Sequence, residues 1–181
     1  GTGLGAKHNI LIKDAPTLEQ VSKIQAVVLD KTGTLTEGKP IITDVIAATG
    51  FTEDEIIALD AAAEAKSSHP LSLAVLEEAK KRKVEIPTTV EKFQNLAGHG
   101  VEAVVDGKKV LVGTNKLMQD RNISIDPIKA DIDRLLSEGK TIMVLAVDGK
   151  VAGVAAASDP VKANAKSAIA RMKDMGLTCL L

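Results

Sequence analysis

The 181-residue sequence has almost no aromatic residues and almost no cysteine: it contains two phenylalanines, no tyrosine, no tryptophan and one cysteine. With so few aromatic rings and a net charge of −1, the chain lacks the stacking platforms and the basic surface that nucleic acids require. Its single cysteine, Cys179, excludes an internal disulfide framework and any Cys-x-x-Cys metal site, as is common in a reducing compartment. No apolar run reaches the roughly 20 residues that cross a bilayer, and the first residues lack the layout of a signal peptide. We therefore expect a cytosolic monomer that is soluble by itself and binds no nucleic acid.

What the sequence does contain is the composition of a globular protein, with 45% hydrophobic and 26% charged residues. At about 100 to 200 residues per domain, its length allows one large domain or two small ones. A continuous apolar run at 26–29 ends at Asp30 and a turn rich in glycine and threonine, which predicts a strand buried on both faces of a parallel sheet. A second strand of this kind is predicted at 177–181. Asp30 then lies at the carboxyl end of a strand, where open α/β sheets bind their ligands.

Between these two strands, the sequence predicts a block of helices and antiparallel strands. Two hairpins are indicated by Asp-Gly turns, which supply the positive φ that a tight turn needs: 101–105 with 109–112, and 142–147 with 151–157. Three helices are predicted from capping residues and apolar spacing, at about 52–66, 70–83 and 128–138. After the block, Asp159 is expected to cap a helix that runs from Pro160 to Gly176.

The order of these elements predicts an α/β fold in which one domain interrupts another. Residues 1–40 form a lead-in and the first part of a domain with parallel strands, and 158–181 return into that domain. Residues 41–157 form the inserted α+β domain, whose antiparallel sheet is flanked by helices. Hinges are expected near Pro40 and Ser158. Because the chain ends within an apolar strand, we expect it to be a fragment of a longer protein.

The segment DKTGTLT, from Asp30 to Thr36, carries the chemistry of the sequence. It places a carboxylate at the end of a strand, beside the cation of Lys31, several hydroxyls and Gly33, which opens the backbone. A carboxylate can attack a phosphoryl group to form an acyl-phosphate when a divalent ion and a cation offset the charge repulsion. Alternatively, Asp30 only ends a strand and the threonines cap a turn. Seven consecutive suitable residues behind a predicted buried strand favour the phosphate site.

The same segment is similar to the phosphorylation motif of the P-type ATPases, ion pumps that pass through an aspartyl-phosphate. The resemblance implies an incomplete haloacid-dehalogenase-like, Rossmann-like phosphorylation domain in which Asp30 is phosphorylated and Lys31 belongs to the catalytic motif. It also implies that Asp30 and the Thr32 main-chain carbonyl hold Mg²⁺, and that Thr34 and the Gly33 turn hold the phosphate. Phosphatases of the same superfamily place a second Asp at the position of Thr32, where it activates water. An acyl-phosphate on Asp30 should therefore persist, as a pump requires.

The inserted block resembles the nucleotide-binding domain of the heavy-metal (P1B-type) subgroup. The residues that carry this resemblance are Glu64, the pair His69-Pro70 and the loop Gly98-His99-Gly100. The resemblance implies that Glu64 and His69 position the adenine end of ATP, and that Gly98 and Gly100 let the backbone approach the nucleotide. Taken alone, a His before Pro is more often a helix cap, and Gly-x-Gly is more often a turn. Their order downstream of DKTGTLT favours the nucleotide site.

Two positions depart from the pattern of this subgroup. Ser68 occupies a position where the family often has Glu. Thr114 occupies a position where an Asn that contacts the nucleotide usually follows the glycine. Either Thr114 replaces that Asn as the hydrogen-bonding group, or Asn115 shifts into its role.

The resemblance predicts that the chain is part of the cytosolic loop of a heavy-metal-transporting P-type ATPase, at the cytoplasmic face of a membrane. Its implied partners are ATP with Mg²⁺, the transmembrane and actuator domains of the same polypeptide, and a heavy-metal cargo for which the resemblance favours copper(I). Later Mg²⁺ carboxylates and the phosphate-site lysine of the family are missing, so this portion by itself is expected to be inactive or nearly so. Two alternatives stay open: a haloacid-dehalogenase-like phosphatase with a cap domain, and a nucleotide-binding module without turnover.

Overall fold

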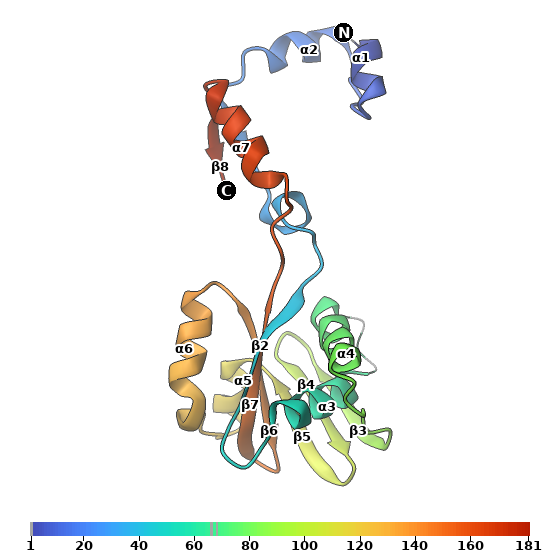
Figure 1. Ribbon diagram of the computed structural model, residues 1–181, viewed down its shortest axis with the longest axis vertical. Coiled ribbons are helices and arrows are strands. Elements are labelled where there is room, and N and C mark those ends of the chain that lie inside the picture. The colour runs from blue at the N-terminus through green and yellow to red at the C-terminus, as the bar shows by residue number, and fades with distance from the viewer. Residues whose placement is uncertain (1, 66, 68) are drawn as a thin grey trace. The chain divides into compact units, whose positions relative to one another are not determined.

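The computed structural model describes residues 2–65, 67 and 69–181, so the departure at Ser68 lies outside the described residues. The chain divides into two compact units, one of Gly1–Gly38 with Val161–Leu181 and one of Lys39–Pro160. Figure 1 traces the elements of both units along the chain. Among the described residues, no helix combines the length and the apolar character needed to span a membrane.

The larger unit is built on a six-stranded antiparallel sheet with the strand order β2-β7-β6-β5-β4-β3. Its strands are β2 (Ile41–Ala47), β3 (Val90–Leu96), β4 (Gly100–Val105), β5 (Lys108–Gly113), β6 (Thr141–Val147) and β7 (Lys150–Ser158). Both predicted hairpins are confirmed, because β4 pairs with β5 and β6 pairs with β7 in antiparallel register. The Asp and the Gly of each turn have positive φ, as such tight turns require.

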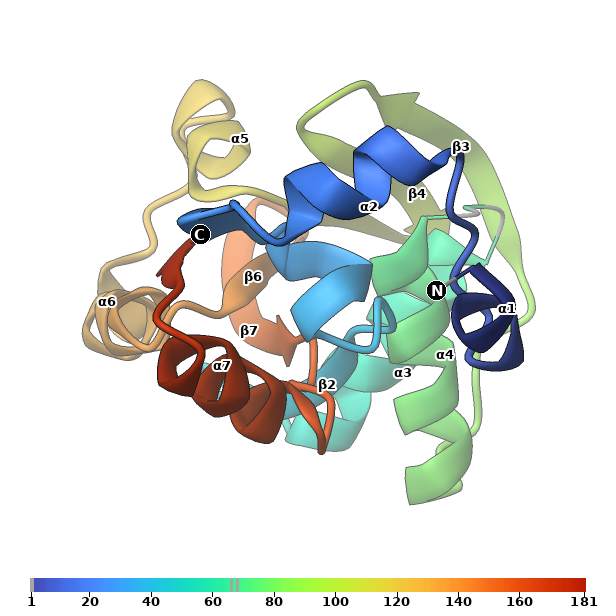
Figure 2. The same cartoon turned by 90° about the horizontal axis from the view of Figure 1, so that it is seen from above.

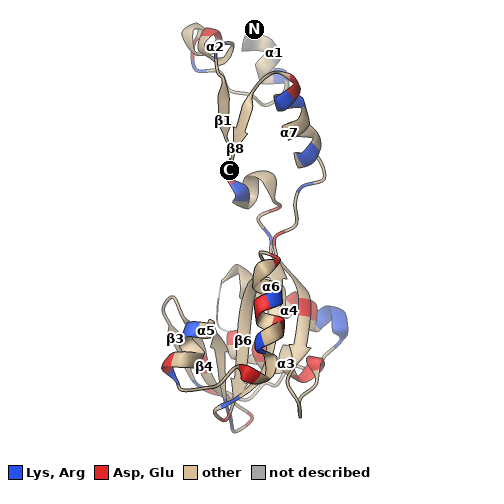
Figure 3. Cartoon of the chain, turned by 90° about the vertical axis from the view of Figure 1, so that its left-hand side faces the viewer, with Lys and Arg blue, Asp and Glu red and all other residues tan. Residues whose placement is uncertain are grey.

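Helices cover both faces of this sheet (Figure 1). On one face lie α3 (Glu53–Glu64) and α4 (Pro70–Arg82); on the other lie α5 (Asn115–Asp120), the 3-10 turn η2 (Asp126–Ile128) and α6 (Lys129–Ser137). Alternate strand residues point to opposite faces, so Val110 and Val112 pack with α3 and α4, whereas Leu111 packs with α5 and α6. Charged side chains concentrate on the helices, and the interior strand β6 carries none (Figure 3).

Local sequence determines where the helices of this unit begin and end. The Thr52 hydroxyl accepts from the Glu55 N–H, and the Glu55 carboxylate accepts from the Thr52 N–H, which is the predicted capping box. α4 has Pro70 at its first position, and its last residue, Arg82, is followed by the C-cap Lys83, whose φ of 57° is left-handed. The three helices predicted for this unit are confirmed, each to within two residues at either end.

Two strands and one α-helix of the larger unit were not predicted: β2, β3 and α5. β2 and β3 are the two edge strands of the sheet, and each contains a register shift, between Ile42 and Asp44 and between Glu91 and Gln94. Such a bulge interrupts the alternation of apolar and polar residues by which a strand is recognised. α5 has only six residues, too few to show a helical period.

The smaller unit contains α1 (Thr2–Lys7), α2 (Ala15–Val21), β1 (Ala26–Val28), the irregular helical turn η1 (Lys31–Leu35), α7 (Ala165–Asp174) and β8 (Thr178–Leu180). β1 and β8 pair in parallel, which confirms the two predicted strands, and α7 packs against β8 (Figure 3). Figure 2 shows α7 close to the C-terminal end of the chain. The prediction that β1 is buried on both faces is wrong, since Val28 is 76% exposed. The sheet of this unit has only two strands, so few neighbouring elements cover its faces.

The last helix starts later than predicted. α7 begins at Ala165 and not at Pro160, because Val161 forms a β-bridge to the loop that follows β1 and is therefore extended. The predicted capping role of Asp159 is also wrong. Its carboxylate accepts instead from the Lys39 N–H at 3.2 Å, within the larger unit.

The fold class is the predicted one. A unit with parallel strands is interrupted by an α+β unit whose antiparallel sheet is flanked by helices. The chain passes from one unit to the other after Gly38 and returns after Pro160.

Candidate functional site

The loop after β1 holds the predicted phosphorylation residues. Asp30 lies two residues after the end of β1 and is exposed. The loop is not a regular helix, since Thr32 has extended backbone angles (φ −77°, ψ 121°) and Gly33 has a φ of 77°, which favours glycine. The side-chain oxygen of Thr36 accepts from the Gly33 N–H and donates to the Lys31 carbonyl, both at 3.1 Å. The Thr36 side chain therefore joins the end of the loop to its start by hydrogen bonds.

A distant segment of the same unit braces this loop. Lys162 Nζ donates to the Gly33 carbonyl at 2.7 Å, and the Lys162 N–H donates to the Leu35 carbonyl at 2.8 Å. Next to it, Val161 pairs with Thr36. The predicted catalytic residues share this one braced and exposed loop: Asp30, Lys31, Thr32 and Thr34. Sequence reasoning missed Lys162, because its contact depends on the return of the chain after the inserted unit.

The loop offers part of a magnesium site. Asp30 has a carboxylate and Thr32 a main-chain carbonyl, and both are the hard oxygen ligands that Mg²⁺ prefers. Among the described residues, no three His, Cys, Asp or Glu side chains gather closely enough to hold a metal ion. Proteins commonly bind Mg²⁺ through one or two carboxylates together with water and phosphate oxygens. The residues present therefore fit Mg²⁺ as an ion that is bound together with a phosphate ligand.

The larger unit contains a pocket of about 360 Å³ next to the start of α4, the start of β4 and the start of β6. This volume lies in the range of small-molecule sites. Five predicted nucleotide-binding residues line it: Glu64, His69, Gly98, Gly100 and Thr114. The other described lining residues are Ser67, Leu71, Asn95, Leu96, Ala97, His99, Val101, Gly113, Thr141, Ile142 and Met143. The fold thus brings together residues from four separate stretches of the chain, and those described include no lysine or arginine.

Glu64 is the last residue of α3, is largely buried and lines the pocket. The hydroxyl of Ser72, in the first turn of α4, donates a hydrogen bond to its carboxylate. Ser72 Oγ also lies 2.8 Å from Ser67 Oγ. No ion pair joins Glu64 to a cation among the residues that the structure describes. The hydrogen-bond partner of the Glu64 carboxylate is therefore the Ser72 hydroxyl, which also contacts the hydroxyl of Ser67.

The two histidines of the pocket have different hydrogen-bond partners. His69 is the N-cap of α4, and its Nδ1 accepts from the Leu71 N–H at 3.2 Å. The proton of the neutral His69 ring is therefore on Nε2. His99 Nδ1 lies 2.9 Å from the Ala97 carbonyl oxygen, a contact that requires a proton on Nδ1. His69 thus caps a helix and also lines the pocket, so the two interpretations of this residue are compatible.

Gly100 is required by the sheet itself. A Cβ on Gly100 would lie 2.0 Å from the Val112 carbonyl oxygen and 2.6 Å from the Cα of Gly113, its partner on β5. Gly98 differs, because a Cβ there would have no atom of the protein within 4 Å, although its φ of 74° is left-handed. Of these two glycines, only Gly98 therefore has open space where a side chain would stand.

The structure distinguishes Thr114 from Asn115, the two candidates for the residue that contacts the nucleotide. Thr114 lines the pocket, and its hydroxyl accepts from the Leu117 N–H at 3.3 Å as the N-cap of α5. The Thr114 N–H donates to the His99 carbonyl at 3.0 Å, which ties it to the glycine loop. Asn115 is not among the described lining residues, and its side-chain oxygen is buried without a hydrogen-bond partner in the described part of the chain.

Some residues at the pocket were not predicted from the sequence. Ser67 and residues 141–143 of β6 line it. Ser72 is not among the described lining residues, but its hydroxyl donates to the Glu64 carboxylate and lies 2.8 Å from Ser67 Oγ. Ser72 could have been found, because it follows His69 at a spacing of three and therefore lies on the same face of the first helical turn. The β6 residues have no such local signal, since pairing with other strands brings them to the pocket.

One further acidic residue lies close to Glu64. Asp60, one turn earlier in α3, is buried, and neither of its carboxylate oxygens has a hydrogen-bond partner among the described residues. Burial, reinforced by the nearby Glu64 carboxylate, raises the pKa of Asp60 well above its ordinary value. Asp60 is not among the described lining residues of the pocket.

Comparisons with known proteins show which family the chain belongs to. The family of haloacid dehalogenase-like hydrolases matches residues 24–181. Two curated relatives are the copper-exporting P-type ATPase of Bacillus subtilis (strain 168) and the silver exporting P-type ATPase of Salmonella typhimurium. Each is 39% identical over 181 residues, which cover 100% of this chain and 22% of the relative. The chain thus spans about a fifth of the length of these relatives.

Solved structures of ATPases share the fold. A zinc-transporting PIB-type ATPase in its E2.Pi state has a TM-score of 0.82 at 35% identity, over 98% of this chain and 28% of that one. The catalytic domain of the CPx-ATPase CopB-B, studied for its conformational changes upon nucleotide binding, has a TM-score of 0.69 at 26% identity, over 93% of this chain and 57% of that one. The resemblance stated from DKTGTLT is confirmed. The chain therefore belongs to the haloacid dehalogenase-like hydrolase family, in which it resembles the metal-transporting P-type ATPases.

Proposed function

We propose that this chain is the nucleotide-binding and phosphoryl-accepting portion of a heavy-metal-transporting P-type ATPase. The observation that carries the proposal is the pocket of the larger unit, which is lined by Glu64, His69, Gly98, Gly100 and Thr114. In this proposal, ATP binds in the pocket, and its γ-phosphoryl group is transferred to Asp30.

The chemistry of the pocket supports a nucleobase as its ligand. Apolar side chains such as Leu71, Leu96 and Ile142 can cover a flat ring, while the Glu64 carboxylate can accept from an exocyclic amine. Nε2–H of His69 adds a donor. The described lining residues include no lysine or arginine to neutralise phosphates, so the pocket takes the base and the triphosphate extends out of it.

At the loop after β1, the Asp30 carboxylate is the proposed nucleophile. One of its oxygens forms a bond to the γ-phosphorus of ATP while the bond between that phosphorus and the bridging oxygen breaks, and ADP leaves. Lys31 supplies a positive charge, and the Thr34 hydroxyl donates to a phosphate oxygen. Asp30 and the Thr32 carbonyl would hold Mg²⁺, whose charge would offset the repulsion between carboxylate and phosphate. Thr32 has no carboxylate to activate water, so the acyl-phosphate persists.

We further propose that the parent protein moves a heavy-metal ion, with copper(I) as the cargo, and that this portion lies at the cytoplasmic face of the membrane. The named relatives export copper or silver, which supports a soft monovalent ion. The proposed partners are the transmembrane and actuator domains of the same polypeptide. Phosphoryl transfer to Asp30 then drives the movement of the ion through these domains.

Calorimetric titration of the chain with ATP, with and without Mg²⁺, tests the pocket. We expect saturable binding that His69→Asn weakens about tenfold, because Asn retains a helix cap but removes the imidazole. His8→Ala, a change to an exposed histidine outside the pocket, should leave the dissociation constant unchanged. A well-folded chain that binds no ATP would contradict the proposal.

Phosphorylation of the complete parent protein tests Asp30. Incubation with labelled ATP should give an acid-stable, hydroxylamine-labile label, as an acyl-phosphate does. Asp30→Asn should abolish this label, whereas a label that persists in the variant would exclude Asp30 as the acceptor.

A further inference from the structure

Glu64 is the single carboxylate among the described residues that line the pocket. Its Oε2 accepts from the hydroxyl of Ser72, a residue of α4 that is 0% exposed. The bond joins the end of α3 to the first turn of α4, so the orientation of the carboxylate depends on both helices.

The hydroxyl protons around Glu64 have one consistent arrangement. A carboxylate can only accept, and Ser72 has one proton, which it donates to Glu64. Ser67 Oγ, 2.8 Å from Ser72 Oγ, therefore donates to Ser72. The His69 N–H in turn donates to Ser67 Oγ at 3.3 Å. The hydrogen bonds thus run in one direction from His69 through Ser67 and Ser72 to Glu64.

We propose that Ser72 is a positioning residue that holds the Glu64 carboxylate ready to accept from the exocyclic amine of adenine, and that it thereby makes the pocket selective for adenine over a base with a carbonyl at that place. Because Oε2 is bonded to Ser72, Oε1 is the oxygen left for the ligand. This inference rests on the proposed function, since it requires the base to bind in the pocket.

The selectivity follows from the fixed direction of the carboxylate. Hypoxanthine carries a carbonyl oxygen in place of the adenine amine, so it would bring a second acceptor against Glu64 with no proton between them. A carboxylate held by Ser72 cannot turn away from that carbonyl. A carboxylate without this partner has more rotational freedom, loses more conformational entropy when it binds an amine, and can turn away from a carbonyl. The Ser72 hydroxyl therefore affects the choice between bases more than the affinity for nucleotides in general.

The test compares the dissociation constants of the 181-residue chain for ATP and for inosine triphosphate (ITP), measured by calorimetry. For the unchanged chain we expect ATP to bind about tenfold more tightly than ITP, the effect of one hydrogen bond to a charged group. Ser72→Ala should weaken ATP binding about five- to tenfold and change ITP binding by less than about twofold. Ser137→Ala is the matched control, because that hydroxyl donates to the Arg134 carbonyl within α6, and it should change neither constant.

Two further variants separate positioning from a general effect on packing. If Ser72 acts through Glu64, then Ser72→Ala introduced into a Glu64→Ala background should change the ATP-to-ITP ratio by less than about twofold. Ser72→Cys has a similar shape and a weaker donor, so its ratio should lie between those of the unchanged chain and Ser72→Ala. Thermal unfolding of each variant reports whether the fold is retained.

If Ser72→Ala leaves the ratio of the ATP and ITP dissociation constants unchanged, whether or not both affinities fall, the inference is overturned. A full effect of Ser72→Ala in the absence of the Glu64 carboxylate would also overturn it. Failure of the unchanged chain to bind ATP is a separate outcome, which contradicts the proposed function itself. The unchanged chain thus tests the pocket, and the variants test Ser72.

Discussion

The ammonium group of Lys162 donates a 2.7 Å hydrogen bond to the main-chain carbonyl of Gly33, a residue 129 positions earlier in the chain. Gly33 is the point at which the loop after β1 turns with positive φ. Lys162→Ala should therefore loosen this loop, so that the amides of residues 31–36 exchange with solvent deuterium faster. Lys166→Ala, a change to an exposed lysine of α7, is the matched control and should leave exchange in the loop unaltered. Equal protection of the loop in Lys162→Ala and the unchanged chain would contradict a bracing role.

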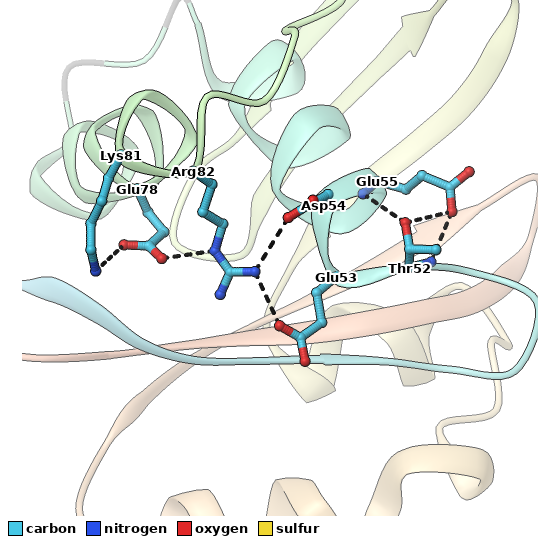
Figure 4. A network of polar contacts seen from close by, with 7 residues as sticks. All are labelled: Thr52, Glu53, Asp54, Glu55, Glu78, Lys81 and Arg82. Atoms are coloured by element: carbon cyan, nitrogen blue, oxygen red, sulfur yellow. Dashed lines mark hydrogen bonds and ion pairs between the residues drawn. The ribbon is translucent and has the colours of Figure 1, made fainter.

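A second prediction concerns Arg82, which joins the end of α4 to the start of α3 (Figure 4). Its Nε donates to Glu78 at 2.8 Å, and one terminal nitrogen donates to Glu53 at 3.0 Å and to Asp54 at 3.4 Å. Arg82→Ala should lower the free energy of unfolding by about 1 to 3 kcal/mol, because the largely buried Glu78 loses its main partner. Urea unfolding measures this change. Lys81→Ala is the control, with a smaller loss, since the Lys81 side chain is 76% exposed.

The same network predicts how the effect of Arg82→Ala depends on pH. Burial raises the pKa of Glu78, but the hydrogen bonds from Arg82 and Lys81 outweigh burial, and the resulting pKa is below the ordinary value of 4.5. A carboxyl group with a lowered pKa stabilises the fold above its unfolded pKa, and this contribution is lost as the pH falls through the folded pKa. The difference in stability between Arg82→Ala and the unchanged chain should therefore be full at pH 7 and shrink below about pH 4.5. An equal difference at pH 7 and pH 3 would show that Glu78 is not the responsible partner.

The parts of the fold that could be predicted are those with strong local signals. The capping box of Thr52 and Glu55 marked the start of α3, and the Asp-Gly turns marked both hairpins. The edge strands β2 and β3 were not predicted, because bulges interrupt their alternation of apolar and polar residues. The position of α7 was misjudged because Asp159 and Pro160 have the local chemistry of a helix start, whereas the β-bridge of Val161 keeps the backbone extended. Tertiary pairing overrides a local preference in that case.

For the candidate sites, residue types could be predicted but their supporting contacts could not. Glu64 and His69 were identified because the motifs follow one another along the chain in the same order as in the family, and both residues line one pocket. The hydroxyl of Ser72 and the ammonium of Lys162 were missed, because each acts across a contact that exists only after two segments have packed. Gly100 was interpreted as a place for the nucleotide to approach. The close contact with the Val112 carbonyl gives it a second reason to be glycine, one that no single-sequence pattern displays.

A third prediction concerns Asp60, the buried carboxyl group of α3 whose oxygens lack described hydrogen-bond partners. Its pKa is raised in the folded state, so its contribution to stability is full below the unfolded value near 3.8 and is lost as the pH rises through the folded pKa. The carboxamide in Asp60→Asn does not ionise, so it carries no charge at any of these pH values. We expect it to raise the melting temperature at pH 7 by a few degrees and to flatten the fall of stability above pH 4. Asp120→Asn, at an exposed position of α5, should change neither quantity. A melting temperature that Asp60→Asn lowers at pH 7 would contradict the prediction.

The last prediction separates Gly98 from Gly100, two of the glycines that line the pocket. Gly100→Ala would place a Cβ 2.0 Å from the Val112 carbonyl oxygen, so β4 and β5 would have to separate, and we expect a loss of about 3 kcal/mol or more in unfolding free energy. Gly98→Ala meets no atom within 4 Å and only strains a left-handed backbone, so it should cost about 1 to 2 kcal/mol and retain the fold.

The matched control for Gly98→Ala is Gly107→Ala, because Gly107 also has a left-handed φ and open space for a Cβ but lies in the β4–β5 turn, outside the pocket lining. Both variants should lose a similar amount of stability in urea unfolding. If the nucleotide approaches the backbone at Gly98, only Gly98→Ala should also weaken ATP binding, by about tenfold, since a methyl group would occupy the space of the ligand. Equal ATP affinities in the two variants would mean that glycine is needed at position 98 only for the backbone conformation of the turn.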